Sequence, residues 1–333
     1  MKVSELGEFG LIELLAKIVG QPKGKQVLIG IGDDAACWRT GVSTQIATSD
    51  SLIQDIHFTL STTTWRELGW KALAVNLSDI AAMGGLPQYT LVSLGLPGDI
   101  EVASVAELYE GIEELARLFD VSIVGGDSVG APVVMVSLAV VGKAQKNQSV
   151  LTRSAAVPGE LIAVTGYLGA SAAGLAILQG VLELYLKDEE TVGTLREAHL
   201  RPHPRVVEGQ ALARHGVKAA IDLSDGLVGD LGRLCKASGV GARLFTSQIP
   251  VHPLVRNSFG GDAIQLALSG GEDYELLFTA RSEVIDRVRG AIACPVTVIG
   301  ETVAEPEMVK VIDEHGNELS VEKAGWEHFV KGR

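Results

Sequence analysis

Acidic residues follow several apolar segments of this 333-residue sequence, at the points where strands are expected to end. They are Asp33 and Asp34 after VLIGIG, Asp50 after QIATS, Asp127 after VSIVGG, and Asp222 and Asp225 after KAAI. One carboxylate at a strand end is commonly a helix cap or a turn former, and Ser224 or Asp225 could cap the helix expected after them. Several carboxylates gathered in one place, however, repel each other unless a cation joins them. The pattern therefore indicates a cation site.

Asp79 occupies an unfavourable position for a carboxylate. The stretch from Trp65 to Met83 is typical of one largely apolar helix, which Gly84 and Gly85 would end. Asp79 lies near its C-terminal end, where the helix dipole disfavours negative charge. The carboxylate therefore needs a positive partner, which could be a metal ion, Lys71 or an arginine.

The ligand type separates the possible metals. Carboxylate oxygens suit Mg²⁺ or Ca²⁺, whereas zinc prefers His and Cys ligands at close spacing. The seven His residues are scattered, and Cys37, Cys235 and Cys294 form no C-x-x-C pair. Magnesium held by carboxylates, waters and phosphate oxygens is the usual arrangement at phosphoryl-transfer sites, so we expect magnesium.

Glycines beside these acids allow backbone N–H groups to approach a phosphate closely. The pairs at 125–126 and 270–271 are examples, although ordinary turns use the same residues. The sequence has no G-x-x-x-x-G-K-[ST] motif and no protein-kinase signature set. The segment TGYLGASAAG departs from G-x-G-x-x-G spacing, which argues against a dinucleotide site.

The composition limits the remaining possibilities. A hydrophobic content of 47% with 21% charged residues indicates a packed globular protein, and the length allows two domains. A net charge of -13 without a cluster of Lys and Arg argues against a nucleic-acid partner. No segment reads as a secretory signal or a membrane span, and the isolated cysteines fit the cytoplasm.

Strand-like and helix-like segments alternate along the chain, which predicts an α/β (α+β) fold. After an amphipathic helix over residues 1–20, the first half shows VLIGIG, QIATSD, the helix from Trp65, YTLVSLGL, a helix from Val102 to Phe119, VSIVGGD and VVMVSLAVVGKA. The Pro-containing stretch from Thr152 to Gly159 interrupts this pattern, so we place a domain boundary near residue 150. The predicted domains are 1–150 and 151–333.

The second half repeats the theme. It shows the strand LIAVTG, a Gly-rich helix from Ala170, a helix near Arg205 to Arg214, the strand KAAIDL, a helix from Gly226, and the strands YELLFTA and PVTVIG. Both halves could therefore be β-α-β-rich units of the same kind.

A set of motifs, in order and across nearly the whole chain, closely resembles the thiamine-monophosphate kinase family. The motifs are GIGDDAA, ATSDSLIQDIHF, NLSDIAAMGG, GGD at 125–127, DLSDGL and SGGEDYEL. Each is shared with other members of the aminoimidazole ribonucleotide synthetase superfamily, but the ordered set, especially DIHF and SGGEDYEL, is more specific. The resemblance implies a two-domain aminoimidazole ribonucleotide synthetase-like fold. Its N-terminal domain would bind ATP and metal and pair sheets in a homodimer, and its C-terminal α/β domain would complete the active site.

The resemblance also implies roles for individual residues. The magnesium ligands would be Asp33, Thr48, Ser49, Asp50, Asp79, Asp127, Asp222 and Asp225, with Asp50, Asp127 and Asp225 as the catalytic acids. The nucleotide contacts would be Tyr109, Gly126, Asp127, Arg153 and Ser224, and the thiamine monophosphate contacts would be His57, Asp273 or its neighbour Glu272, and Trp326. Arg153 could instead be an ordinary linker residue, and Trp326 could simply pack the final segment onto the core.

The activity that the resemblance implies is magnesium-assisted transfer of phosphate from ATP to thiamine monophosphate, the last step of thiamine diphosphate biosynthesis, in the cytoplasm. An anionic acceptor phosphate needs alignment and charge neutralisation but no strong base, which fits the residues present. One rival is another ATP-dependent enzyme that activates an amide or a selenide. The ending VKGR has no terminal Cys to accept a group, and no reactive Cys lies in a glycine-rich N-terminal segment. A second rival, a nucleotide-binding scaffold, would not need so many acids.

Overall fold

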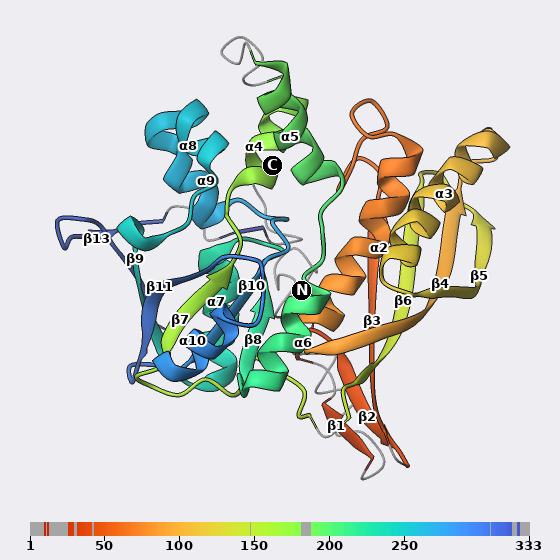
Figure 1. Cartoon of the computed structure of the whole chain (residues 1–333). Coiled ribbons are helices and arrows are strands. Elements are labelled where there is room, and N and C mark those ends of the chain that lie inside the picture. The colour runs from red at the N-terminus through yellow and green to blue at the C-terminus, as the bar shows by residue number, and fades with distance from the viewer. Residues whose placement is uncertain are drawn as a thin grey trace.

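The computed structural model describes residues 10, 12, 26–29, 32–41, 43–146, 148–180, 188–306, 308–321 and 325–326. The amphipathic helix expected over residues 1–20 lies almost entirely outside the described residues. Two sheets with their helices form an N-terminal and a C-terminal half that lie side by side (Figure 1). This mixed arrangement confirms the predicted fold class.

A six-stranded sheet forms the N-terminal half, in the order β1-β2-β3-β6-β4-β5. Its strands are β1 (Val27–Ile29), β2 (Ala36–Thr40), β3 (Ser43–Ile53), β4 (Gly85–Leu96), β5 (Ser122–Gly130) and β6 (Met135–Ala144). Neighbouring strands are antiparallel except β4 and β5, which are parallel. Helices α2 (Trp65–Ala82) and α3 (Val102–Leu118) pack together beside this sheet, close to the predicted ranges (Figure 1).

Helix α2 is the central element of the molecule. It begins with a capping box, in which Thr64 and Glu67 each bond the other's backbone N–H. It contacts β3, β4 and β6 on one side and α6 (Val206–His215) and β8 (Ala219–Asp222) of the C-terminal half on the other. Because α2 is covered from both sides, polar residues such as Lys71, Asn76 and Ser78 are buried along with its apolar ones.

Two glycines let α2 and α3 approach each other at backbone distance. A Cβ on Gly69 would lie 1.9 Å from the carbonyl oxygen of Leu108, and a Cβ on Gly111 would lie 1.9 Å from that of Arg66. Any side chain at either position would therefore push the helices apart.

A seven-stranded sheet forms the C-terminal half, in the order β13-β12-β9-β11-β7-β10-β8. Its strands are β7 (Leu161–Thr165), β8 (Ala219–Asp222), β9 (Gly241–Phe245), β10 (Leu276–Ala280), β11 (Val296–Val303), β12 (Val309–Ile312) and β13 (Glu318–Leu319). Its helices are α4 (Ala170–Leu178), α5 (Glu189–Leu200), α6 (Val206–His215), α7 (Leu227–Ser238), α8 (Pro253–Phe259), α9 (Ala263–Ser269) and α10 (Ser282–Arg289).

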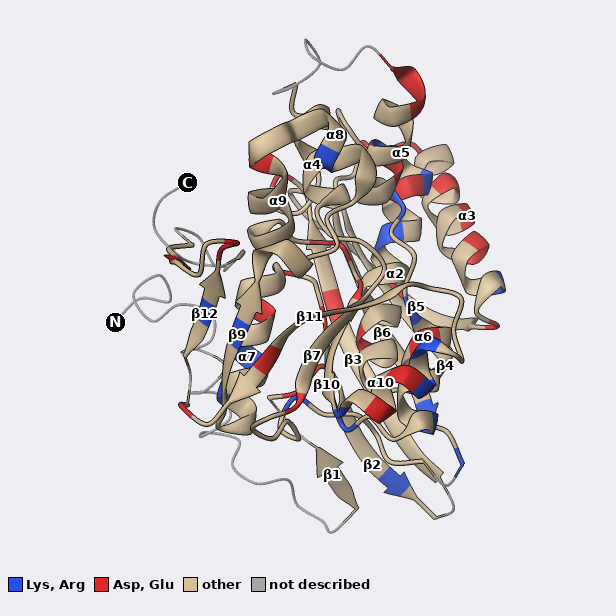
Figure 2. Cartoon of the chain, turned by 60° about the vertical axis from the view of Figure 1, so that its left-hand side comes forward, with Lys and Arg blue, Asp and Glu red and all other residues tan. Residues whose placement is uncertain are grey.

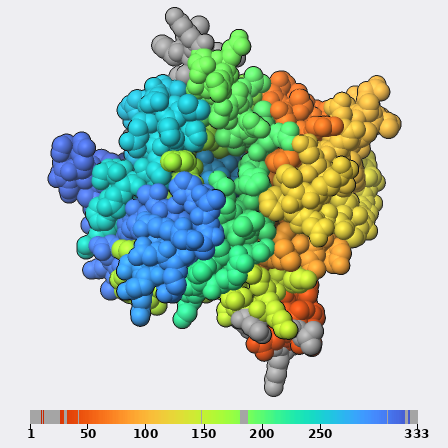
Figure 3. Space-filling model, viewed as in Figure 1, coloured from red at the N-terminus to blue at the C-terminus, as the bar shows by residue number. Residues whose placement is uncertain are grey.

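The two halves share one apolar core where they meet. Leu77 and Ala81 of α2 belong to the same buried cluster as Leu212 of α6 and Phe278 of β10. Figure 3 shows the orange and yellow N-terminal half packed against green residues of the C-terminal half. The boundary expected near residue 150 falls between β6 and β7, and the division there stays a prediction.

The surface charges and the helix compositions bear on possible partners. Figure 2 shows acidic residues along α3, whereas Lys and Arg are scattered in that view. Among the helices of the described residues, none combines the length and the apolar character needed to cross a bilayer.

Candidate active site

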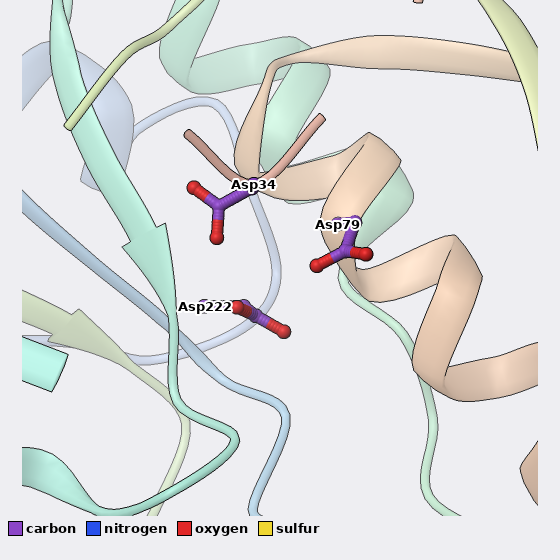
Figure 4. Close-up of side chains that lie close together, drawn as sticks. All are labelled: Asp34, Asp79 and Asp222. Atoms are coloured by element: carbon purple, nitrogen blue, oxygen red, sulfur yellow. The ribbon is translucent and has the colours of Figure 1, made fainter. Parts of the chain in front are cut away.

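Three carboxylates from distant parts of the chain converge where the two halves meet. Asp34 precedes β2, Asp79 lies in the last turn of α2, and Asp222 ends β8. One oxygen of each lies within 4.8 Å of the others, and Figure 4 shows the three side chains around one space. Two of the three acids come from the N-terminal half and one from the C-terminal half, so the site depends on both. We call Asp34, Asp79 and Asp222 the carboxylate cluster.

Hydroxyl groups orient two members of the carboxylate cluster. The hydroxyl of Thr48 on β3 donates to Oδ2 of Asp79 at 2.5 Å. The buried hydroxyl of Ser78 on α2 donates to Oδ2 of Asp222 at 2.6 Å. Each bond occupies one oxygen of its carboxylate and fixes the other in place.

Asp34 is held differently and keeps an unused oxygen. Its Oδ1 pairs with the guanidinium of Arg153. Its Oδ2 is buried and has no hydrogen-bond partner among the described residues. A buried anionic oxygen without a partner is costly, so a cation is the ligand expected there.

Asp50 joins the site through the alternation of β3. Thr48 and Asp50 face α2, whereas Ser49 between them points to the opposite, exposed face of the sheet. The backbone N–H of Asp50 donates to the Asn76 side chain of α2 at 3.0 Å. Its side chain also interacts with that of Asp79.

The electrostatics of these acids reflect burial and crowding. Burial, and then the charges of Asp50 and Asp222, raise the pKa of Asp79 well above its usual range. Burial, and then the charge of Asp34, do the same to the pKa of Asp222. The pKa of Asp50 is also raised, mainly by burial. A bound divalent cation would reverse this effect by stabilising the ionised forms.

Asp33 and Asp34 face different partners despite being adjacent. The Asp33 carboxylate accepts hydrogen bonds from the backbone N–H of Asp34 at 3.0 Å and of Arg153 at 3.2 Å. Burial, and then the charge of Asp34, raise its pKa to about 6. Asp34, which the sequence placed at a strand end but not among the ligands, is the member that meets Asp79 and Asp222.

The loop of the motif SGGEDYEL packs on the loop that follows Asp222. The backbone N–H of Glu272 donates to the carbonyl of Ser224 at 2.7 Å, and that of Tyr274 donates to Leu223 at 2.9 Å. The Glu272 carboxylate pairs with Lys71 of α2 at 2.8 Å. Burial raises its pKa, but the interactions with Lys71 and then with His199 outweigh this, so the pKa lies below its ordinary value. Glu272 is therefore ionised.

Asp273 has a structural position in this loop. Its Oδ2 accepts from the backbone N–H of Gly169 at 2.7 Å and its Oδ1 from that of Ser171 at 3.2 Å, at the start of α4. Burial raises the pKa of Asp273 to about 7. Of the two neighbours offered for substrate binding, Glu272 has the more available carboxylate.

Other expected substrate contacts lie near the same two loops. The backbone N–H of Trp326 donates to the carbonyl of Asp225 at 3.0 Å, which returns the C-terminal segment to this site. The Asp225 carboxylate pairs with Arg233. His57, in the turn after β3, accepts from the backbone of Ile53 at 3.0 Å and acts electrostatically on Glu272.

Some expected ligands lie elsewhere in the single chain. Asp127 and Gly126 are exposed on β5, which is separated from β3 by β6 and β4, and Tyr109 is half-buried on α3. Gly126 has a packing reason to be glycine, because a Cβ there would lie 1.8 Å from the carbonyl oxygen of Val92. The chain alone does not bring these residues into the carboxylate cluster, and their roles stay predictions.

Sequence reasoning left some residues of the site out of the predicted ligands and substrate contacts. Asp34, Ser78, Lys71 and Tyr274 line or adjoin it. Burial raises the pKa of Tyr274 most, and the charges of Glu272, Asp50, Asp222 and Asp225 raise it further, in that order. The signal for Asp34 was present in its place beside Asp33, and Tyr274 lies within SGGEDYEL. Neither Ser224 nor Asp225 caps helix α7, because the N-cap residue is Gly226 and the side chain of Asp230 accepts from its backbone N–H.

Two hollows of the surface lie apart from the carboxylate cluster. One, of about 590 Å³, lies between the start of α2 and α5, and the other, of about 470 Å³, includes Trp70, Ser171 and Asp273 in its lining. Neither is lined by Asp34, Asp79 or Asp222. The candidate site is therefore defined by its converging charges rather than by the size of a cavity.

Comparisons with known proteins identify the family. Residues 32–144 match the model of the AIR synthase related protein, N-terminal domain, and residues 157–313 match that of its C-terminal domain. The chain is 40% identical over 329 residues to thiamine-monophosphate kinase of Escherichia coli (strain K12), covering 97% of this chain and 98% of that protein. It is 36% identical over 312 residues to the Bacillus subtilis (strain 168) enzyme, covering 90% and 93%.

Solved structures give the same result. The structure of AaThiL complexed with AMPPCP and TMP superposes with a TM-score of 0.85 at 34% identity, covering 98% of this chain and 99% of that one. Thiamine monophosphate kinase from Aquifex aeolicus gives a TM-score of 0.80 at 32% identity, covering 96% and 100%. The hydrogenase maturation protein HypE in the HypE-HypF complex, at 17% identity and a TM-score of 0.70, shares the fold. The chain belongs to the thiamine-monophosphate kinase family, with both domains of the AIR synthase related proteins.

Proposed function

We propose that this protein transfers the γ-phosphoryl group of ATP to the phosphate of thiamine monophosphate, giving thiamine diphosphate. The observation that carries the proposal is the carboxylate cluster with its unpartnered Asp34 oxygen, in a chain that covers its kinase relatives almost end to end. The solved relative complexed with AMPPCP and TMP supports both substrates.

The cluster has the chemistry of a magnesium site. Its donors are carboxylate oxygens, which suit a hard cation, and Asp34 Oδ2 is buried without a partner among the described residues. Asp34, Asp79 and Asp222 would hold the ion, with Asp50 beside them. Magnesium bound there would neutralise charge on the phosphates and align them.

The chain's own residues bind and orient the two substrates. Arg153 has a buried Nε without a hydrogen-bond partner among the described residues, which leaves a donor for a phosphate oxygen. Glu272 presents an ionised carboxylate, and His57 and Trp326 lie near the same loops. Because the acceptor phosphate is already an anionic nucleophile, the site needs no base to activate it, and transfer is direct.

We further propose that the working form is a homodimer. Tyr89 and Leu91 of β4 are 48% and 45% exposed on the face of the sheet opposite α2. An exposed apolar sheet face next to β5, whose outer edge pairs with no other described strand, is suited to a second sheet. Pairing with a second copy would also make another subunit's Asp127, Gly126 and Tyr109 available, which one chain leaves apart from the cluster.

The unpaired Cys37, Cys235 and Cys294 support a place in the reducing cytoplasm.

The test is a panel of acceptors incubated with ATP and magnesium and analysed by mass spectrometry. The panel holds thiamine monophosphate, free thiamine, other phosphorylated vitamins and formylglycinamidine ribonucleotide. The proposal expects one added phosphate on thiamine monophosphate alone. Equal turnover of thiamine, or turnover only of the ribonucleotide, contradicts it.

A further inference from the structure

A lysine of α2 is buried at the junction of the two halves, outside the carboxylate cluster. Lys71 is 2% exposed, and it is one of the largest fully buried side chains among the described residues. An ammonium removed from water in this way needs partners that replace its hydration. Among the described residues it has two, both from the C-terminal half: Oε2 of Glu272 at 2.8 Å and Nε2 of His199 at 3.3 Å.

The partners of Lys71 also define the state of His199. An ammonium can only donate, so Nε2 of His199 accepts and its Nδ1 carries the hydrogen. Nδ1 lies 3.2 Å from Oε2 of Glu272 and 3.0 Å from the hydroxyl of Ser171. Glu272 Oε2 therefore accepts from Lys71 of α2, with the His199 ring of α5 beside it.

The backbone holds Glu272 as firmly as the side-chain contacts do. Its φ of 67° lies in the left-handed region, which is uncommon for a residue other than glycine, and its N–H is fixed by the carbonyl of Ser224 at 2.7 Å. The side chain remains 26% exposed, and its contacts with Lys71 and His199 both use Oε2. Oε1 is thus left for a ligand beside the loop that follows Asp222.

We propose that Lys71 is a positioning residue for the acceptor substrate: it fixes the Glu272 carboxylate so that Oε1 receives the cationic end of the acceptor. This inference rests on the proposed function, since thiamine monophosphate carries a positively charged thiazolium ring. Lys71 acts through Glu272 and does not itself contact the substrate. Because Lys71 belongs to one half and Glu272 to the other, acceptor binding also depends on the contact between the halves.

The test is a double-mutant cycle with Lys71→Met, Glu272→Gln and the double variant, measured as KM for each substrate and as kcat. Losing one partner of a buried charge pair weakens binding strongly, so each single variant should raise KM for thiamine monophosphate by about tenfold or more. KM for ATP should stay within about twofold, since the nucleotide contacts are untouched. The double variant should match Glu272→Gln alone, because Lys71 has no other route to the substrate.

A control variant distinguishes a positioning role of Lys71 from a general role in holding the two halves together. Arg201 also joins them near α2, since it pairs with Glu114 and stacks over the ring of Trp70 at 4.1 Å. Arg201→Met should leave KM for thiamine monophosphate unchanged. An equal rise in KM for Arg201→Met and Lys71→Met would overturn the inference.

The remaining outcomes are also decisive. If Lys71→Met leaves Glu272 unpaired and fails to fold, the double variant, which lacks both charges, is compared with Glu272→Gln. A double variant with a much higher KM than Glu272→Gln overturns the positioning role in favour of direct contact by Lys71. Wild-type turnover with an unchanged KM in Lys71→Met overturns this inference alone. No wild-type turnover of thiamine monophosphate overturns the proposed function, and this inference with it.

Discussion

Buried carboxylates that face one another dominate the chemistry of this site. Asp34, Asp79 and Asp222 have few positive neighbours, and their repulsion opposes folding unless protons or a cation neutralise them. Thr48 and Ser78 orient the acids without neutralising them, and Arg153 supplies one positive charge. The arrangement is suited to holding a divalent ion against phosphate rather than to holding the fold together.

Replacing Asp79 tests this directly. Asp79→Asn keeps the shape and can still accept from Thr48, but it removes one charge. Activity should fall by about 100-fold or more, because a lost metal contact removes several kcal/mol of transition-state stabilisation. In chelator the variant should be as stable as wild type or more stable. Its gain in stability from magnesium with a non-hydrolysable ATP analogue should shrink, as followed by thermal unfolding.

The control is a buried carboxylate with a structural role. Glu275 is 5% exposed and pairs with Arg205 and Thr165. Glu275→Gln should lose roughly 3–5 kcal/mol of stability with or without metal, since it breaks a buried pair. Asp79→Asn behaving in the same way would show that Asp79 is not a metal ligand.

Stability without metal should depend on pH with a definite sign. Folding raises the pKa of Asp33 from 3.8 to about 6 and those of Asp79 and Asp222 further. The folded protein then binds more protons than the unfolded chain, so stability is greatest below about pH 4 for these groups and is lost as pH rises through about 6 and above. Denaturant unfolding in chelator from pH 5 to 8 should show this fall, and magnesium should reduce it. A flat profile in chelator would contradict the account.

The sequence predicted the residues of the site better than their partners. Asp50 and Asp222 could be found because acids recur after apolar segments, and Asp79 because an acid late in an apolar helix is unfavourable. The choice of Asp33 over Asp34 could not be made, since only the turn before β2 decides which of two adjacent acids faces Asp79. Lys71 was weighed as a partner for Asp79, but it pairs with Glu272, more than 200 positions away along the chain.

Helix α2 is the element that does most to position the side chains of the site. It carries Asp79, Ser78, Asn76 and Lys71, and it lies between the first sheet and the C-terminal half. Its place is set by α3 on one side, through the approach at Gly69 and Gly111. A small change in the packing of α2 against α3 would therefore displace the acidic side chains of the site.

Gly69→Ala tests this packing. The new Cβ would lie 1.9 Å from the Leu108 carbonyl oxygen, so the helices must separate, at a cost of about 1–3 kcal/mol. Gly193→Ala in α5 is the matched control, because a Cβ there meets nothing within 4 Å. It should be neutral or stabilising by about 0.5–1 kcal/mol. Thermal unfolding measures both, and equal effects of the two substitutions would refute the packing role.

The elements themselves were largely predictable, because their patterns are local. The apolar stretch ending at Gly84 gave α2 nearly to its last residue, and the Val-rich segment after Pro132 gave β6. The order of the strands was not predictable from local patterns, because β6 lies between β3 and β4, which both come earlier in the sequence. That order is what separates Asp127 on β5 from Asp50 on β3.

At the scale of the whole molecule, the site spans two halves and, in our proposal, two subunits. Leu91→Asp places a charge on the exposed face of β4 and should give a monomer by light scattering, with little activity. Val207, 61% exposed on α6, is the control, and Val207→Asp should remain dimeric. A wild-type monomer with full activity would contradict the homodimer.

In our proposal, the phosphoryl group passes directly between two substrates held at the carboxylate cluster. The measurement is a single-turnover reaction with ATP labelled at its γ-phosphorus, magnesium and thiamine monophosphate, followed by denaturation and separation of protein from small molecules. Direct transfer predicts that all transferred label appears in thiamine diphosphate, and that the protein stays unlabelled whether or not the acceptor is present. Stable, stoichiometric label on the protein before the acceptor is added, or no labelled thiamine diphosphate, would contradict it.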